Sequence, residues 1–237
     1  MTRRLDDPEV VREQYATEDN LRARAALWRE IDGPDAKAEL WQALAGVLPR
    51  RVLEVGGGDG WLSERLRDEL GCEVTMVDQS ERMVELAAAR GLDARVGDVQ
   101  ELPFADGAFD TAVAAWMLYH VQDIDRGLSE LVRILAPGGH LVALTNSRRH
   151  CEELFDLIAY PQERREWVFN AENGEETPRR HFGTVERRDL VAAATVRDRE
   201  TLVAYQQSMS LDTKPVPEDV PLPFSVHAPS VVFVAAK

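Results

Sequence analysis

Residues Arg51–Trp61 read RVLEVGGGDGW. Val52–Val55 is apolar apart from Glu54, and three glycines follow it directly, with a fourth, Gly60, after Asp59. This order predicts a buried parallel strand that ends in a glycine turn, with a helix beginning near Asp59. Glycine suits such a turn because it adopts positive φ and lets the backbone approach a ligand closely. The helix would then point its N-terminal amides and positive dipole end at a ligand above the strand.

The glycine spacing argues against two common nucleotide sites. In the dinucleotide pattern G-x-G-x-x-G/A, the last small residue lets helix and strand pack closely. Counted from Gly56, that position holds Trp61, which is too large, and counted from Gly58 it holds Ser63, which fits only loosely. No lysine follows the glycines, so the P-loop pattern is absent. A tight strand–helix connection that binds no ligand remains an alternative.

An acid two residues before the glycines, Glu54, gives a pattern that resembles motif I of the class I S-adenosylmethionine-dependent methyltransferases. The resemblance implies cofactor contacts by the residues of this motif, Glu54, Gly56, Gly57, Gly58 and Gly60. The predicted second strand, Cys72–Val77, is followed by Asp78. An acid at this strand end can accept hydrogen bonds from both hydroxyls of a ribose. Because NAD also contains adenosine, Asp78 is consistent with either cofactor.

Residues Gly97–Val121 read GDVQELPFADGAFDTAVAAWMLYHV and give the most specific match to the same family. The resemblance implies that Asp98 accepts a hydrogen bond from the adenine amine and that the Val99 amide donates to a ring nitrogen. It also implies that the cofactor borders Gln79, Met83 and Ala115. The apolar run Phe109–Ala115 is typical of a strand in a sheet that is covered on both faces.

A further family signature, APGGHL at Ala136–Leu141, precedes the predicted fifth strand, so the resemblance covers about residues 50–147. It implies an α/β fold, a Rossmann-like doubly wound sheet of seven strands whose last strand, at 225–235, is antiparallel. We expect residues 1–48 to form a helical N-terminal cap and residues 49–237 to form the methyltransferase domain. Within that domain, residues 148–181 are a candidate substrate lid or, equally, a surface loop.

The region that precedes the glycine turn has two possible roles. Alanine, leucine and glutamate recur across residues 8–48, and a helix broken at Gly33-Pro34 is predicted there. This region either packs over the ligand or forms a plain helical edge of the fold. In related methyltransferases a leading helix often closes over the methyl donor, which makes Tyr15 and Arg22 candidate contacts.

Composition points to a small-molecule substrate. The formal net charge is −14, and the arginines are scattered among acids, whereas a nucleic-acid binder usually carries a basic stripe. The acidity could also serve solubility alone. No apolar stretch is long enough to span a membrane and no apolar signal core is seen, so we expect a cytoplasmic protein without membrane contact. Cys72 and Cys151 lie far apart, so we expect neither a disulfide framework nor a metal site.

Methyl transfer from a sulfonium needs an in-line arrangement and exclusion of water, and a base only when the acceptor loses a proton. His120, after the fourth strand, is a candidate base, although a loop-packing histidine is the commoner alternative; His181 and His150 are weaker candidates. We expect S-adenosylmethionine as the cofactor and a small molecule as the acceptor, with no nucleic acid. Three alternatives stay open: an RNA-modifying methyltransferase, a nicotinamide-dependent oxidoreductase, and a non-catalytic cofactor-binding module.

Overall fold

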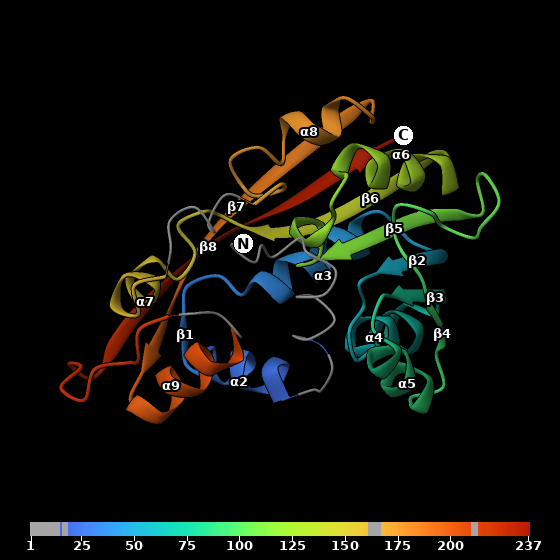
Figure 1. Cartoon of the computed structure of the whole chain (residues 1–237). Helices are drawn as coiled ribbons and strands as arrows, with labels where there is room; N and C mark the ends of the chain where they lie inside the picture. The colour runs from blue at the N-terminus through green and yellow to red at the C-terminus, as the bar shows by residue number, and fades with distance from the viewer. Residues whose placement is uncertain (1–14, 16–18, 161–166, 210–212) are drawn as a thin grey trace.

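The computed structural model describes residues 15, 19–160, 167–209 and 213–237. Within them, one sheet of eight strands crosses the molecule in the order β1-β7-β8-β6-β5-β2-β3-β4, with helices on both faces (Figure 1). The predicted Rossmann-like α/β class is therefore confirmed, with one strand more than the seven expected.

Five neighbouring strands form the parallel part of the sheet. They are β2 (Arg51–Val55), β3 (Glu73–Asp78), β4 (Asp93–Val96), β5 (Phe109–Ala115) and β6 (Leu135–Asn146). The strand order reverses at β2, which pairs in parallel with β3 on one side and with β5 on the other. In open α/β sheets, ligands bind at the carboxyl ends of the strands beside such a reversal. The glycines follow β2, so they lie at this edge.

The remaining three strands are antiparallel. They are β1 (Ile31–Asp32), β7 (Thr184–Val196) and β8 (Phe224–Ala236). β8 lies antiparallel between β6 and β7, which confirms the predicted terminal antiparallel strand. The additional strand is β1, which pairs with β7 at the edge of the sheet. Its two residues give no periodic signal, and its partners at Ala193 and Ala194 are distant in sequence.

Apolar side chains from alternate positions of the strands fill two separate layers. On one face, Leu53 and Ala112 pack with Leu128 of α6 (Ile124–Ile134). On the other face, Val52 packs with residues of two further helices. These helices are α3 (Ala36–Gly46) and α4 (Trp61–Leu70). Burial of both faces explains why the central strands read as continuous apolar runs.

Two of the helices beside the glycine turn have well-defined caps. Ser80 caps α5 (Glu81–Ala89) by accepting a hydrogen bond from the Met83 amide, and Gly71 ends α4 with φ of 67°. A left-handed residue at this position is the usual glycine C-cap.

A second apolar cluster lies beyond the parallel strands and brings together Leu27, Phe155, Leu202 and Val226. It joins α2 (Asp19–Leu27), α7 (Glu152–Leu157) and α9 (Arg199–Ser208) to the far half of β8. Figure 1 shows α2 beside α9, at the opposite end of the molecule from α4 and α5. Within the region predicted to be helical, the described residues therefore give two helices separated by the short strand β1.

Two short helices complete the described part of the chain, η1 (Leu118–His120) and α8 (Glu176–Arg179). Among the residues that the structure describes, no helix has the length and apolar character needed to cross a bilayer. The segment 161–166 of the predicted lid lies outside the described residues.

Candidate functional site

A cavity of about 920 Å³ opens at the carboxyl ends of the parallel strands. It runs from the glycine turn after β2 to the inner sides of α2 and α9, so residues from both ends of the chain line it. This volume is at the upper end of the range for sites that bind one small molecule. The cavity is therefore large enough to hold more than one compact ligand.

The glycine turn forms one end of this cavity. Gly56 has φ of 65°, and a Cβ there would lie 2.6 Å from Cβ of Met117. Gly58 has φ of 59°, but a Cβ built on it would meet no atom within 4 Å. The first glycine is thus required by the packing of the protein, whereas the second leaves open backbone facing the cavity. Such a surface fits a ligand that is bound against the main chain.

Asp78 lies at the end of β3, beside this turn. Its two carboxylate oxygens accept hydrogen bonds from the backbone amides of Gly58 and Ser80, each at 2.9 Å. Burial raises the pKa of Asp78, and the hydrogen bonds from backbone amides act against that rise. A carboxylate held in this way retains lone pairs for the hydroxyls of a ribose. The position fits the predicted cofactor.

Glu54 is almost fully buried at 2% exposure beneath the glycine turn. The Ser63 hydroxyl of α4 donates a hydrogen bond to one of its carboxylate oxygens. Burial raises the pKa of Glu54 to about 7, the hydrogen bonds with Ser63 lower it, and the negative charges of Asp78 and Asp59 raise it further. A cationic group bound in the cavity would favour the ionised form.

Most of the predicted cofactor residues line the cavity. These are Tyr15, Glu54, Gly56, Gly57, Gly58, Asp78, Gln79, Val99 and Ala115. Their contacts with a cofactor stay a prediction, but the structure brings them together around one end of a single cavity.

Three predicted cofactor residues are not in the lining. A Cβ on Gly60 would meet Leu92 at 2.6 Å and Ala87 of α5 at 2.9 Å, so this glycine serves the packing of the start of α4 against α5. Met83 is fully buried in the core. The Asp98 carboxylate accepts hydrogen bonds from the backbone and side-chain nitrogens of Gln100, the former at 2.9 Å. Turn geometry thus gives Asp98 a protein partner that the sequence motif did not reveal.

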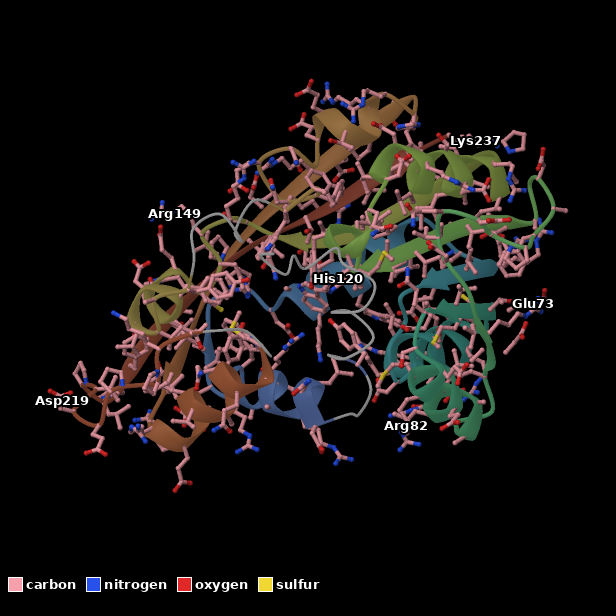
Figure 2. All side chains as sticks on the ribbon, in the orientation of Figure 1. Glu73, Arg82, His120, Arg149, Asp219 and Lys237 are labelled. Carbon is pink, nitrogen blue, oxygen red and sulfur yellow. The ribbon has the colours of Figure 1, made fainter. Side chains whose placement is uncertain are left out.

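His120 lines the middle of the cavity, where Figure 2 shows it between the two ends of the molecule. Its Nε2 lies 3.2 Å from the Tyr15 hydroxyl. The Tyr15 backbone carbonyl accepts a hydrogen bond from the Ser80 hydroxyl at 2.9 Å, at the start of α5. Tyr15 therefore joins the glycine end of the cavity to His120.

His181 is not brought to the cavity. Its Nε2 lies 2.8 Å from a carboxylate oxygen of Asp125, and its Nδ1 lies 3.4 Å from the Ser129 hydroxyl. Both partners belong to α6, on the face of the sheet away from α3 and α4. In the structure this candidate base contacts Asp125 and Ser129 instead, because the segment after α8 lies against α6.

The opposite end of the cavity contains residues that the sequence did not single out. The Arg24 guanidinium on α2 donates to the Ser208 backbone carbonyl at 2.9 Å, and its Nη1 lies 3.4 Å from the Tyr15 hydroxyl. Burial acts against the charged form of Arg24, but the nearby tyrosines Tyr15, Tyr205 and Tyr119 favour it, and the pKa of Arg24 is raised. These residues come from distant segments with no shared motif, so no sequence signal could have grouped them.

Within the described part of the chain, two nitrogen atoms at this end are buried without a hydrogen-bond partner. They are Nδ1 of His150 and Nε1 of Trp167, and both residues line the cavity. Burial lowers the pKa of His150 to about 4, while a hydrogen bond with Pro229 and the nearby charge of Glu153 act in the opposite direction. The imidazole is therefore neutral near pH 7.

Aromatic side chains form part of the cavity wall. Trp28, Phe155 and Trp167 line the cavity, but Phe169 is fully buried in the core, 5.9 Å from the ring of Phe233. Within the described ranges, no three histidine, cysteine, aspartate or glutamate side chains gather as a metal site would require.

The comparison with protein families identifies the domain that surrounds the glycine turn. Residues 53–143 match the family described as "Methyltransferase domain". This part of the chain carries a methyltransferase domain. The match begins within β2 and ends within β6, so this methyltransferase domain includes the parallel strands and the glycine end of the cavity.

Curated relatives match part of the chain. A demethylmenaquinone methyltransferase of Thermus thermophilus is 40% identical over 103 residues, which are 40% of this chain and 47% of the relative. A ubiquinone biosynthesis O-methyltransferase of Xanthomonas oryzae is 33% identical over 145 residues, covering 55% of this chain and 60% of the relative. The matched regions thus span roughly half of each relative.

A solved structure matches over a longer range. It is a methyltransferase of Thermotoga maritima described as a possible histamine N-methyltransferase, with a TM-score of 0.56 and 25% identity. The match covers 85% of this chain and 89% of that chain. The predicted family and cofactor class are thereby confirmed, whereas most residues of the opposite end of the cavity, Tyr119 excepted, lie outside the family match.

Proposed function

We propose that the protein transfers a methyl group from S-adenosylmethionine to a small-molecule acceptor. The observation that carries this proposal is one continuous cavity with the glycine turn and Asp78 at one end and aromatic side chains at the other. Group transfer requires two ligands to meet in a defined orientation, and a shared cavity brings them together.

Residues of the first end would hold the cofactor. Gly58 offers open backbone, Asp78 offers carboxylate oxygens for a ribose, and Val99 is proposed to contact the adenine ring. When bound, S-adenosylmethionine supplies a methyl group that is already activated by its sulfonium. The protein then needs chiefly to orient the acceptor and to exclude water.

His120 is proposed to accept a proton when the acceptor reacts through a hydroxyl group. Its Nε2 is 3.2 Å from the Tyr15 hydroxyl, so an acceptor hydroxyl in the same place would be within reach of the same nitrogen. His120→Asn is expected to lower kcat at least tenfold and to leave binding of S-adenosylhomocysteine unchanged. An unchanged kcat would assign His120 to loop packing.

The proposed acceptor is a small molecule rather than RNA, DNA or protein. The net charge of −14 opposes binding of a polyanion, and the two curated relatives are named for menaquinone and ubiquinone chemistry. We therefore propose a compact organic acceptor, without assigning the atom that is methylated. A cytoplasmic location stays a prediction from the sequence.

Calorimetry with S-adenosylhomocysteine tests the cofactor site. Wild type is expected to bind, and Asp78→Ala is expected to bind about 30-fold more weakly, because two charge-assisted hydrogen bonds to the ribose are lost. Asp93→Ala is a matched control, since Asp93 pairs with Arg95 outside the cavity. Equal binding of S-adenosylhomocysteine by wild type and Asp78→Ala would contradict the assignment. Tight binding of NADH in the same experiment would favour an oxidoreductase.

Labelled cofactor tests the acceptor. The enzyme is incubated with total RNA in one reaction and with a small-metabolite extract in another. Label in the metabolite fraction supports the proposal, whereas salt-sensitive label in RNA alone would contradict it. Cofactor binding with no label in either fraction would point to a non-catalytic module.

A further inference from the structure

We propose that Asn146 selects the acceptor by donating a hydrogen bond from its side-chain amide to a carbonyl or hydroxyl oxygen of that molecule. This inference rests on the proposed function and names a specificity-determining residue of the same cavity. Its basis is the set of contacts that fix the Asn146 side chain at the end of β6.

The Asn146 side chain is held in one defined orientation. Its Oδ1 accepts a hydrogen bond from the indole Nε1 of Trp116 at 3.0 Å. An indole N–H can only donate, so the atom that faces it is the amide oxygen and not the amide nitrogen. The Ser230 hydroxyl lies 3.3 Å from the same oxygen. Because both contacts are made by Oδ1, Nδ2 is left on the other branch of the planar amide.

This amide nitrogen remains available to a ligand. Asn146 lines the cavity, and in the part of the chain that the structure describes its Nδ2 has no hydrogen-bond partner. The residue is otherwise well enclosed, with an exposure of only 9%. A hydrogen bond from an enclosed donor is electrostatically stronger than one on the open surface, so Nδ2 can discriminate between ligands.

The backbone on both sides of the Trp116–Asn146 contact is firmly held. Asn146 pairs with Ser230 of β8, and its carbonyl accepts from the Ala171 amide at 3.0 Å. Trp116 directly follows β5 with φ of 54°, which is unusual for a bulky residue, and its amide donates to the Leu144 carbonyl at 2.8 Å. Backbone strain of this kind clusters at functional sites. The strained residue and the oriented amide therefore form one unit at the edge of the cavity.

The position of Asn146 in the sheet favours contact with the acceptor rather than the cofactor. The strand order is β6-β5-β2-β3, so Asn146 and Asp78 lie at strand ends on opposite sides of the glycine turn. With about 4.8 Å between neighbouring strands, β6 is about 10 Å from β2 and about 14 Å from β3. A cofactor whose ribose binds Asp78 therefore leaves the space at Asn146 to a second molecule.

A carbonyl or hydroxyl oxygen suits this donor. The groups that contact the Asn146 side chain, Trp116 and Ser230, are uncharged. One neutral amide offsets the desolvation of a neutral oxygen, whereas a carboxylate loses more hydration than one such bond returns. An ammonium group has no lone pair, so it would set its own N–H donors against that of Asn146.

Three variants separate this role from a structural one. Asn146→Asp keeps an oxygen for Trp116 and replaces only the donor that faces the cavity. Asn146→Ala and Trp116→Phe remove the same hydrogen bond from its two sides, but only Asn146→Ala also removes the donor. Rates are measured with labelled S-adenosylmethionine and dilutions of a small-metabolite extract. The apparent KM for the methylated component is expected to rise about tenfold in Asn146→Asp, about fivefold in Asn146→Ala and less than about threefold in Trp116→Phe.

A matched pair of probes tests the same contact without turnover. Acetophenone and ethylbenzene have nearly the same shape and differ in one carbonyl oxygen. Each is titrated into the ¹⁵N-labelled full chain saturated with S-adenosylhomocysteine and followed by NMR. Acetophenone is expected to bind about fivefold more tightly and to shift the side-chain amide signals of Asn146, which are identified by their absence in Asn146→Asp.

Each outcome decides the role of Asn146. An unchanged KM in Asn146→Asp, equal losses in Asn146→Ala and Trp116→Phe, or equal or absent binding of the two probes would overturn the inference. Binding of S-adenosylhomocysteine that is much weaker in Asn146→Asp would also overturn it, because Asn146 would then hold the cofactor. If wild type binds no S-adenosylhomocysteine or methylates no component of the extract, the proposed function fails instead, and the probe pair still tests Asn146.

Discussion

The two ends of the cavity are built in different ways. The glycine end is formed by the turn after β2 and by the ends of β3 and β5, which lie within one stretch of fewer than seventy residues. The opposite end is formed by side chains from α2, α7 and α9, which are brought together by the apolar cluster around Leu27 and Leu202. The first is a property of consecutive motifs, and the second is a property of long-range packing.

The electrostatic character of the two ends also differs. At the glycine end, burial raises the pKa of a carboxylic acid, Glu54, to about 7. At the opposite end, burial lowers the pKa of a base, His150, to about 4. In both places burial disfavours the charged form. A rise in pH therefore removes the contribution of Glu54 to stability, whereas a fall in pH removes that of His150.

The largest expected effect concerns Gly56 at the turn. Gly56→Ala should lower the free energy of unfolding by about 3 kcal/mol, because it adds backbone strain at positive φ and a collision with Met117. Gly58→Ala is the matched control, since it shares the positive φ but meets no neighbouring atom. It should cost about 1 kcal/mol in urea unfolding. Equal losses in the two variants would contradict the packing role assigned to Gly56.

The second prediction concerns Glu54 and a loss of stability as pH rises from about 4.5 to 7. Its pKa is higher in the folded than in the unfolded chain, so the folded state binds more protons between about pH 4.5 and 7. Its contribution to stability is therefore present at low pH and is lost as pH rises through that window, by an amount on the order of 3 kcal/mol. Glu54→Gln should remove this pH-dependent loss. Compared with wild type, the variant should therefore be more stable at pH 8 than it is at pH 5. Parallel unfolding curves for the two proteins across that range would refute it.

The third and smallest effect should appear at the opposite end and in acid. The folded pKa of His150 lies below its unfolded value, so its contribution is complete above about pH 6.5 and is lost as pH falls toward 4. We expect a loss of about 2 kcal/mol in the free energy of unfolding. This value is smaller than full burial would give, because the His150 side chain is only partly buried. His150→Gln should flatten the acid limb of the stability profile, whereas His140→Gln, outside the cavity lining, should not. An unchanged acid limb in His150→Gln would contradict the assignment.

Sequence reasoning was effective wherever function depends on backbone conformation. The strand, glycine turn and helix at Arg51–Trp61 follow from apolar runs and from glycine's access to positive φ, and both are local properties. Family motifs placed Asp78 and Val99 at the same cavity end as these glycines. The motif placed Asp98 there as well, but the structure turns its carboxylate toward Gln100.

The remaining differences arise from interactions between distant segments. Strand β1 exists because Ile31 and Asp32 meet β7, which is about 160 residues away, and no two-residue run can signal that pairing. His181 and His120 are the same residue type, so the sequence does not distinguish their surroundings. Only the path of the chain decides that His181 pairs with Asp125 while His120 faces Tyr15.

The sequence by itself determined the α/β fold, the methyltransferase domain and the residues of the glycine end, because these depend on short-range backbone geometry and on motifs that are continuous in the chain. Only the tertiary structure decided that Arg24, Tyr119, His150, Trp167 and Tyr205 share one cavity end. The physical reason is that contacts between distant segments, such as the packing of α2, α7 and α9, set their positions, and single residues in separate segments carry no periodic or spaced pattern that would reveal such packing.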